Sequence, residues 1–303
     1  MQTRDSLSAF LHTPEWQAHS GATPDGSGNL VTSHSLPAGG SYLLSTRAVI
    51  PKNWRLPDYS GKWFMRIQPD SEESHQNLLA VTKQFKHAEA HAIQPRETMF
   101  VDLTLSEEVL LSNMKQKHRY NLKIAQREGV QIDHITKDAV KSLDRFWKLL
   151  TATSDRHTFR LHTKEHYASI LSHLGEKASL AFATKDGKDV AALMLITEDT
   201  VATYLHGGSI YEFRSLMAPY LLHWRLMVTL KAKGFTAYDF WGVHTLNGDA
   251  IKGHASEGVS RFKLGFGGIL HHYPTTVDVI FEPFRYSAYK TIQRFRSRKR
   301  AFA

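Results

Sequence analysis

Hydrophobic and polar positions follow two different spacings along this chain, and the changes between them mark the expected elements. Short runs rich in aromatic, β-branched and leucine residues, bounded by proline, glycine or charged turns, predict strands at 41–50, 63–67 and 98–103. The preceding stretch, 21–35, is rich in glycine, serine, threonine and asparagine. That composition predicts a mobile surface loop after a short opening helix.

A helical spacing begins after residue 103. Thr104 or Ser106 can cap a helix whose first turn holds Glu107 and Glu108, and Gly129 is suited to end it. One face of this helix carries Leu111, Met114, His118, Leu122 and Ala125. The pattern therefore predicts one continuous helix up to Gly129.

The second half of the chain mixes both spacings. Helices are expected at about 138–154, 164–174 and 219–233, and strands at 180–184, 190–197, 201–207, 237–243 and 269–273. The dipeptide Asp186-Gly187 between two strands predicts a hairpin turn. This order of strands, loop, long helix and strand is that of an acyltransferase half of the GNAT type, and the N-terminal half offers a weaker series.

Length and composition narrow the classes of protein. At 303 residues the chain exceeds the usual single core, so one large or two moderate domains are expected. The absence of cysteine excludes thiol nucleophiles, disulfides and thiolate metal sites, and the scattered histidines form no HExxH pair. The first eleven residues lack an apolar signal core, and no later stretch approaches the roughly 18 apolar residues of a membrane span. We therefore expect a cytoplasmic protein without a metal or cofactor.

The chain is strongly basic. Its formal net charge of +9 and isoelectric point near 9.5 favour a polyanionic partner. Nucleic acid, a nucleotide-linked substrate and an anionic membrane surface all meet that description.

The segment Ser260-Arg261-Phe262-Lys263-Leu264-Gly265-Phe266-Gly267-Gly268 carries the most specific candidate chemistry. It places a lysine between aromatic rings and beside three glycines, where backbone N–H groups can approach a ligand. A cation held there can stabilise a developing oxyanion or a phosphate. Spacing alone favours another interpretation, a bulged strand whose Lys263 points to water.

The loop from Gly207 to Pro219 lies between a strand and a helix start, where a GNAT enzyme cradles the pyrophosphate of coenzyme A. Arg214 is suited to grip a phosphate or carboxylate, or else forms a surface ion pair. Met217 and Pro219 stand where glycines would be needed, which disfavours acetyl-CoA. Tyr220 is either a ligand contact or a core aromatic at the helix start.

Cationic side chains cover the rest of the helix expected to end at Gly129: Lys115, Lys117, Arg119, Lys123 and Arg127. Charge pattern alone favours a solvated face. The functional interpretation is contact with phosphates, which would position a nucleic acid without reading its sequence.

Taken in order, these motifs resemble the Fem (FemABX) family of tRNA-dependent aminoacyl transferases, which add amino acids to peptidoglycan precursors. The resemblance extends over most of the chain. It rests on 10–16 for the opening helix, 93–103 for a first-domain strand, 114–130 for the basic helix, 204–224 with 238–243 for the second-domain core, and Phe262-Lys263 with the glycines that follow.

The resemblance implies an α/β (α+β) fold of two compact GNAT-like domains, the first of 1–137 plus about 275–303 and the second of 138–274. It implies a donor bound as aminoacyl-tRNA and an acceptor that is a UDP-linked or lipid-linked muropeptide precursor. Lys263 matches the lysine that stabilises the tetrahedral transition state, and Arg214 matches the arginine that holds the precursor's phosphate. Phe262 and Tyr220 are then further substrate contacts, and Lys115, Lys117, Arg119 and Lys123 are tRNA contacts.

Two departures from the family pattern stand out. The segment between Leu149 and Leu180 is too short for the long helical arm of some members, and 249–260 has no clear counterpart of a family tyrosine. No general base is evident, with Asp102 and Asp239 as candidates. The tail 286–300 mixes arginine and lysine with aromatic residues, which suits tRNA phosphates, peripheral contact with the inner membrane surface, or a disordered end.

We expect a monomeric aminoacyltransferase. Two alternatives remain: an acyl-CoA-dependent N-acyltransferase, which the order of elements favours, and a non-catalytic tRNA- or RNA-binding protein, which the charge favours.

Overall fold

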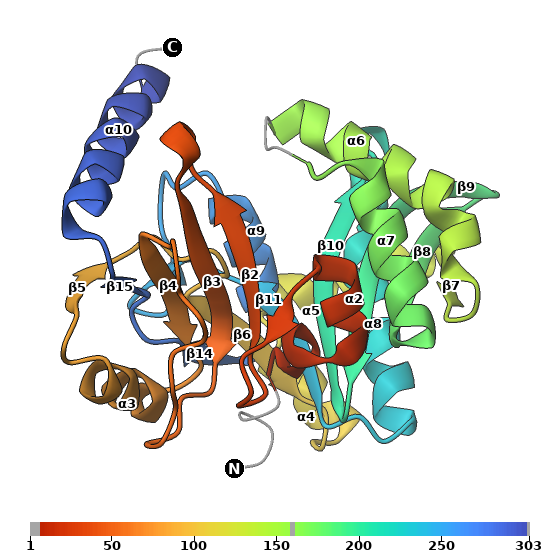
Figure 1. Ribbon diagram of the computed structural model, residues 1–303. Helices are drawn as coiled ribbons and strands as arrows, with labels where there is room; N and C mark the ends of the chain where they lie inside the picture. The colour runs from red at the N-terminus through yellow and green to blue at the C-terminus, as the bar shows by residue number, and fades with distance from the viewer. Residues whose placement is uncertain (1–6, 158–160, 302–303) are drawn as a thin grey trace. The chain divides into compact units, whose positions relative to one another are not determined.

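The computed structural model describes residues 7–157 and 161–301, excepting the side chains of 38, 155–157 and 294–301, and it divides into two compact units (Figure 1). Unit 1 comprises Met1–His19 and Glu97–His272, and unit 2 comprises Ser20–Arg96 and Tyr273–Ala303. The division differs from the expected boundary at 137. Residues 97–137 belong to unit 1 because β6 (Glu97–Asp102) pairs with two strands of that unit's sheet.

Unit 1 is built on a seven-stranded sheet with the order β14-β6-β11-β10-β9-β8-β7. Its other strands are β7 (Gln131–Ile135), β8 (Ala178–Lys185), β9 (Lys188–Glu198), β10 (Val201–Ser209), β11 (Ala237–Gly242) and β14 (Ile269–His272). All neighbours are antiparallel except β10 and β11, which are parallel. On β8, Leu180 and Phe182 enter one core cluster while Ala181 and Ala183 enter another, so both faces of the sheet are buried.

Helices cover both faces of this sheet (Figure 1). One face holds α4 (Glu107–Asn113), α5 (Gln116–Arg127) and α8 (Ala218–Ala232). The other holds η1 (Ala9–His12), α6 (Leu143–His157) and α7 (Lys164–Leu174). The remaining elements are α2 (Pro14–Ser20), η3 (Ala139–Ser142), η4 (Gly175–Lys177), η5 (Tyr211–Leu216), β12 (Thr245–Leu246), β13 (Asp249–Ala250) and α9 (Glu257–Leu264).

Several local predictions are confirmed. The helix expected at 164–174 is α7, whose Thr163 side chain accepts a hydrogen bond from the His166 N–H. The hairpin turn between β8 and β9 is also present. Asp186 and Gly187 both have positive φ, 49° and 73°, the values that a two-residue turn of this kind requires.

The helix expected to run to Gly129 is instead two helices, α4 and α5. Met114 is extended, with φ −66° and ψ 144°, and the Lys115 N–H donates to the Gly265 carbonyl at 2.9 Å. The corner thus depends on a partner about 150 residues away in the sequence, which helical periodicity cannot detect.

Unit 2 contains a six-stranded sheet with the order β1-β2-β3-β4-β15-β5. Its strands are β1 (Thr23–Pro24), β2 (Leu30–Ser35), β3 (Ser41–Ala48), β4 (Phe64–Pro69), β5 (Lys86–Glu89) and β15 (Val277–Ile280), and its helices are η2 (Pro37–Gly39), α3 (Glu72–Val81) and α10 (Pro283–Ala301). The prediction of a loop at 21–35 was wrong for its second half, because β2 pairs there with β3. β15 reaches the sheet from the end of the chain and lies between β4 and β5.

A buried ion pair fixes β15 in that sheet. The Arg66 guanidinium donates to both carboxylate oxygens of Asp278 at 2.8 Å, and the Tyr286 hydroxyl donates to Asp278 Oδ2 at 2.9 Å. Because α10 supplies Tyr286, the same network fixes the start of that helix. Among the described residues, no helix is both long enough and apolar enough to span a membrane.

Candidate active site

Lys263 lies in the last turn of α9 and is 7% exposed. Its ammonium group donates to the Gly242 carbonyl at 2.8 Å and lies 5.3 Å from the centre of the Tyr204 ring. The interpretation of this residue as part of a bulged strand with its side chain in water was therefore wrong. Among the described residues its ammonium donates to a single carbonyl, so it keeps donors available for a ligand.

The two strands nearest the Lys263 ammonium, β10 and β11, stop pairing with each other close to it. β10 and β11 pair in parallel only from Val201–Ala237 to Thr203–Asp239. Beyond Asp239, β11 is irregular: Trp241 has φ 58°, and its N–H donates to Asp239 Oδ1 at 2.8 Å. Tyr204 belongs to β10 and Gly242 to β11, so the Lys263 ammonium lies between the two strands where their pairing has ended, a place we call the opening between β10 and β11.

Burial sets the charge of this lysine. Removal from water lowers the pKa of Lys263 from 10.5 to about 8, and the negative charge of Asp239 opposes that shift. Asp239 is fully buried and accepts a hydrogen bond from the Thr98 hydroxyl. Lys263 thus remains mostly a cation at neutral pH, in surroundings where its charge is weakly screened.

An aromatic cluster lies beside Lys263. Phe262 of α9 contacts Tyr220 of α8, with ring centres 5.1 Å apart, and Tyr220 contacts His118 of α5 at 4.8 Å. His118 Nε2 lies 2.8 Å from the Phe262 carbonyl oxygen, and burial lowers the pKa of His118. The structure therefore brings Phe262 and Tyr220 together, and it adds His118, which the helical pattern indicated only as a core-facing position.

The glycines of this segment are explained by close contacts with α4 and α5. A Cβ on Gly265 would overlap the His118 ring, and one on Gly267 would overlap the Asn113 carbonyl oxygen. Gly267 also has φ +75°, a region that favours glycine. These glycines let the turn after Lys263 pack against the α4–α5 corner.

Changing Gly267 to alanine is expected to lower the free energy of unfolding by about 2 kcal/mol, since both overpacking and a left-handed backbone oppose a Cβ there. Chemical denaturation measures this. Gly258→Ala is the matched control, because Gly258 lies in α9 with nothing within 4 Å of its added Cβ, and its stability should be unchanged or slightly raised. Equal stability of the two variants would contradict the packing explanation.

Arg214 lies in η5, just before α8. It is exposed, its Nη1 donates to the Tyr211 carbonyl at 3.2 Å, and its guanidinium carbon lies 4.1 Å from the centre of the Tyr211 ring. Met217 has φ 51°, and its N–H donates to the Arg214 carbonyl at 3.2 Å. Because Pro219 has no N–H, the loop offers few free donors for a pyrophosphate.

The four candidate phosphate contacts on α5 differ in their surroundings. Lys117 and Lys123 are exposed, and Lys115 is exposed with its ammonium 4.0 Å from Asp249 Oδ1. Arg119 is half-buried, and its Nη1 donates to the carbonyls of Ser112, at 3.2 Å, and Met114. Arg119 therefore closes the end of α4, a contact that charge pattern did not indicate.

The two aspartates considered as bases lie in different places. Asp102 Oδ1 accepts from the N–H and hydroxyl of Thr104, at 2.9 and 2.6 Å, and so shapes the turn after β6. Asp239 alone is beside Lys263. Among the described residues, no group of three or more histidine, aspartate or glutamate side chains is placed to hold a metal ion.

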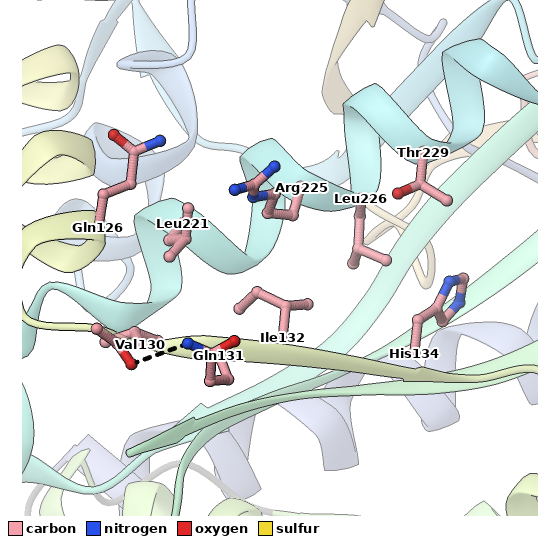
Figure 2. A pocket seen from close by; sticks show the side chains of 10 residues that line it. Gln126, Val130, Gln131, Ile132, His134, Leu221, Arg225, Leu226 and Thr229 are labelled. Carbon is pink, nitrogen blue, oxygen red and sulfur yellow. Dashed lines mark hydrogen bonds between the residues drawn. The ribbon is translucent and has the colours of Figure 1, made fainter. Parts of the chain in front are cut away.

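A separate pocket of about 390 Å³ lies between α5, β7 and α8. Figure 2 shows Gln126 and Arg225 on the helices and Gln131 and Ile132 on the strand that faces them. Of the candidate site residues Lys263, Arg214, Phe262, Tyr220 and the four cations of α5, none lines it. Arg225 and Leu221 lie on the opposite side of α8 from Tyr220 and His223, so this pocket is distinct from the Lys263 site.

Comparison with known proteins decides the family. The model of the FemAB family matches residues 75–189 and 183–294, which is more than half of the chain. The chain belongs to the FemAB family. This confirms the resemblance on which Lys263 and Arg214 were selected.

Solved structures share the fold of this FemAB protein. The crystal structure of FemX has a TM-score of 0.75 at 17% identity and covers 95% of this chain and 97% of that one. L-PGS from Bacillus licheniformis has a TM-score of 0.57 at 14% identity, covering 91% of each chain, and a conserved protein from Bacteroides thetaiotaomicron has 0.59 at 10%, covering 91% and 92%. These similarities confirm the predicted mixed α/β fold, which the structure divides into two compact units.

Proposed function

We propose that this FemAB protein transfers an amino acid from aminoacyl-tRNA to an amine of a peptidoglycan precursor. Family membership supports peptidoglycan-related aminoacyl transfer at the level of the family. The single observation that carries the proposal for this chain is the buried Lys263 ammonium in the opening between β10 and β11.

The chemistry suits a fixed cation. The acceptor amine attacks the ester carbonyl of the aminoacyl-tRNA, a C–N bond forms, and the carbonyl oxygen gains negative charge. The ester C–O bond then breaks, and the tRNA ribose leaves as a hydroxyl that takes up the proton lost by the amine. An ammonium placed at the developing oxyanion in a water-poor site lowers this barrier by about 3 kcal/mol.

The positions of the other candidates are consistent with two anionic substrates. Arg214 is exposed on the loop before α8, so its guanidinium can hold the phosphate of a UDP-linked or lipid-linked precursor. The exposed Lys117 and Lys123 of α5, together with Lys115, can meet tRNA phosphates. Phe262, which precedes Lys263 in α9, packs its ring against that of Tyr220.

An acyl-CoA-dependent N-acyltransferase is the second candidate, favoured by the parallel strands β10 and β11 that α8 connects. The loop argues against it, because the Met217 N–H is already bonded and Pro219 has none. Calorimetric titration with coenzyme A separates the two candidates, since tight binding would favour the acyl-CoA enzyme.

The direct test is to incubate the protein with a pool of charged tRNAs and muropeptide precursors and to read product masses. We expect one precursor to gain the mass of a single amino-acid residue, and ribonuclease treatment of the donor pool should abolish that gain. A pool in which every precursor keeps its mass would refute the proposal, and retention of tRNA alone would favour a non-catalytic RNA binder.

A further inference from the structure

The first half of α10 is fixed to the sheet of unit 2 by one side only. Tyr286 and Tyr289 are buried, and the Tyr286 hydroxyl is held by the Arg66–Asp278 pair. Tyr289 stacks on Phe64 of β4, with ring centres 5.2 Å apart. These contacts decide which face of the helix packs on the protein and which face is free.

The free face carries a row of apolar side chains. Phe284 is 94% exposed and Ile292 is 41% exposed, and Ala288, midway between them, is exposed as well. Positions four residues apart form one row along a helix, so these exposed side chains line a continuous stripe that lies away from Tyr286. We call Phe284, Ala288 and Ile292 the α10 stripe.

The stripe is set in a strongly basic helix. Arg285 and Lys290 lie within the described part, and the sequence adds five more cations: Arg294, Arg296, Arg298, Lys299 and Arg300. From residue 283 to the last residue the sequence has no aspartate or glutamate. In Figure 1, α10 runs on past the strands β4, β15 and β5 of its own unit.

We propose that the α10 stripe docks on an anionic lipid surface. The aromatic and aliphatic side chains enter the boundary between headgroups and acyl chains, while the surrounding lysine and arginine side chains meet lipid phosphates. RNA would satisfy the cations but offers no apolar layer for an exposed phenylalanine and isoleucine in a row. The proposal concerns a surface of unit 2 and does not depend on the transferase activity.

Flotation of the full chain with lipid vesicles tests the docking surface. We expect the protein to float with vesicles of phosphatidylcholine and phosphatidylglycerol, to stay in solution with phosphatidylcholine alone, and to dissociate in high salt. Phe284→Ala should lower the partition coefficient about tenfold, the effect of losing one buried aromatic side chain. Arg285→Gln should lower it about fivefold on the anionic vesicles.

Ile93→Ala is the matched control, because Ile93 is a 48% exposed aliphatic side chain of the same unit outside α10. Its partition should equal that of the unaltered protein. Equal binding to neutral and anionic vesicles, or an unchanged partition of Phe284→Ala, would overturn the proposal. A Phe284→Ala variant that loses affinity for tRNA but not for vesicles would assign the surface to RNA instead.

Discussion

Alanine in place of Lys263 is expected to lower kcat for aminoacyl transfer by about 10² to 10³, with little change in KM for either substrate. The reason is that the ammonium interacts with charge that develops only in the transition state, and loss of one such donor typically has this effect. Lys263 is the cation in the opening between β10 and β11, with the Gly242 carbonyl as its hydrogen-bond partner. Steady-state kinetics with a charged tRNA and a precursor measures both constants.

Two controls separate catalysis from folding and from binding. Lys263→Ala leaves the Gly242 carbonyl without its donor, so circular dichroism and the melting temperature must show that the variant is folded. Arg214→Ala removes an exposed side chain and should raise KM for the precursor while kcat changes little, because Arg214 is proposed to bind the substrate phosphate. A folded Lys263→Ala variant with full kcat would refute the oxyanion role of Lys263.

The elements that local sequence decides were predicted correctly. The hairpin at Asp186-Gly187 needs two residues with positive φ, and aspartate followed by glycine is a preferred pair for such a turn. The helix α7 has its cap, its apolar face and its following glycine between Thr163 and Gly175. These features required no information from distant parts of the chain.

The elements that depend on distant partners were not predictable in the same way. The corner between α4 and α5 exists because Lys115 pairs with the carbonyl of Gly265, and Gly265 fits only because it lacks a Cβ against His118. β15 joins the sheet of unit 2 from the far end of the chain. In the sequence its Asp278 looks like an ordinary charged residue, because the pairing with Arg66 is visible only in the fold.

The candidate site illustrates the same limit. Sequence resemblance selected Lys263, Arg214, Phe262 and Tyr220, and the structure brings Phe262 and Tyr220 into contact beside Lys263. The burial of Lys263 could not be predicted, because it follows from the separation of two parallel strands and the irregular backbone at Trp241. Arg119 shows the converse, since a cation that the resemblance assigned to tRNA contact also holds the end of α4.

Activity and stability should respond in opposite directions as pH rises through the pKa of Lys263. Burial lowers that pKa from 10.5 to about 8, so the folded protein releases the proton at a pH where the unfolded chain still holds it. Between about pH 8 and 10.5 the unfolded state binds more protons, and linkage then makes the stability contribution of this residue rise with pH. The rise amounts to about 3 kcal/mol over the whole window. Below pH 8 both states are protonated, and the contribution is constant.

Denaturation of the unaltered protein and of Lys263→Met at a series of pH values isolates this contribution, because titrating groups that do not interact with Lys263 cancel in the difference. The stability of the unaltered protein relative to Lys263→Met should increase from pH 8 upward. Transfer activity that needs the ammonium should instead fall above pH 8, and Lys263→Arg, which keeps its charge in this range, should lose that falling limb. If activity rises through pH 8 and Lys263→Arg is inactive, the neutral amine of Lys263 is the working form. The residue would then act as a base toward the incoming amine rather than as the cation that stabilises the oxyanion.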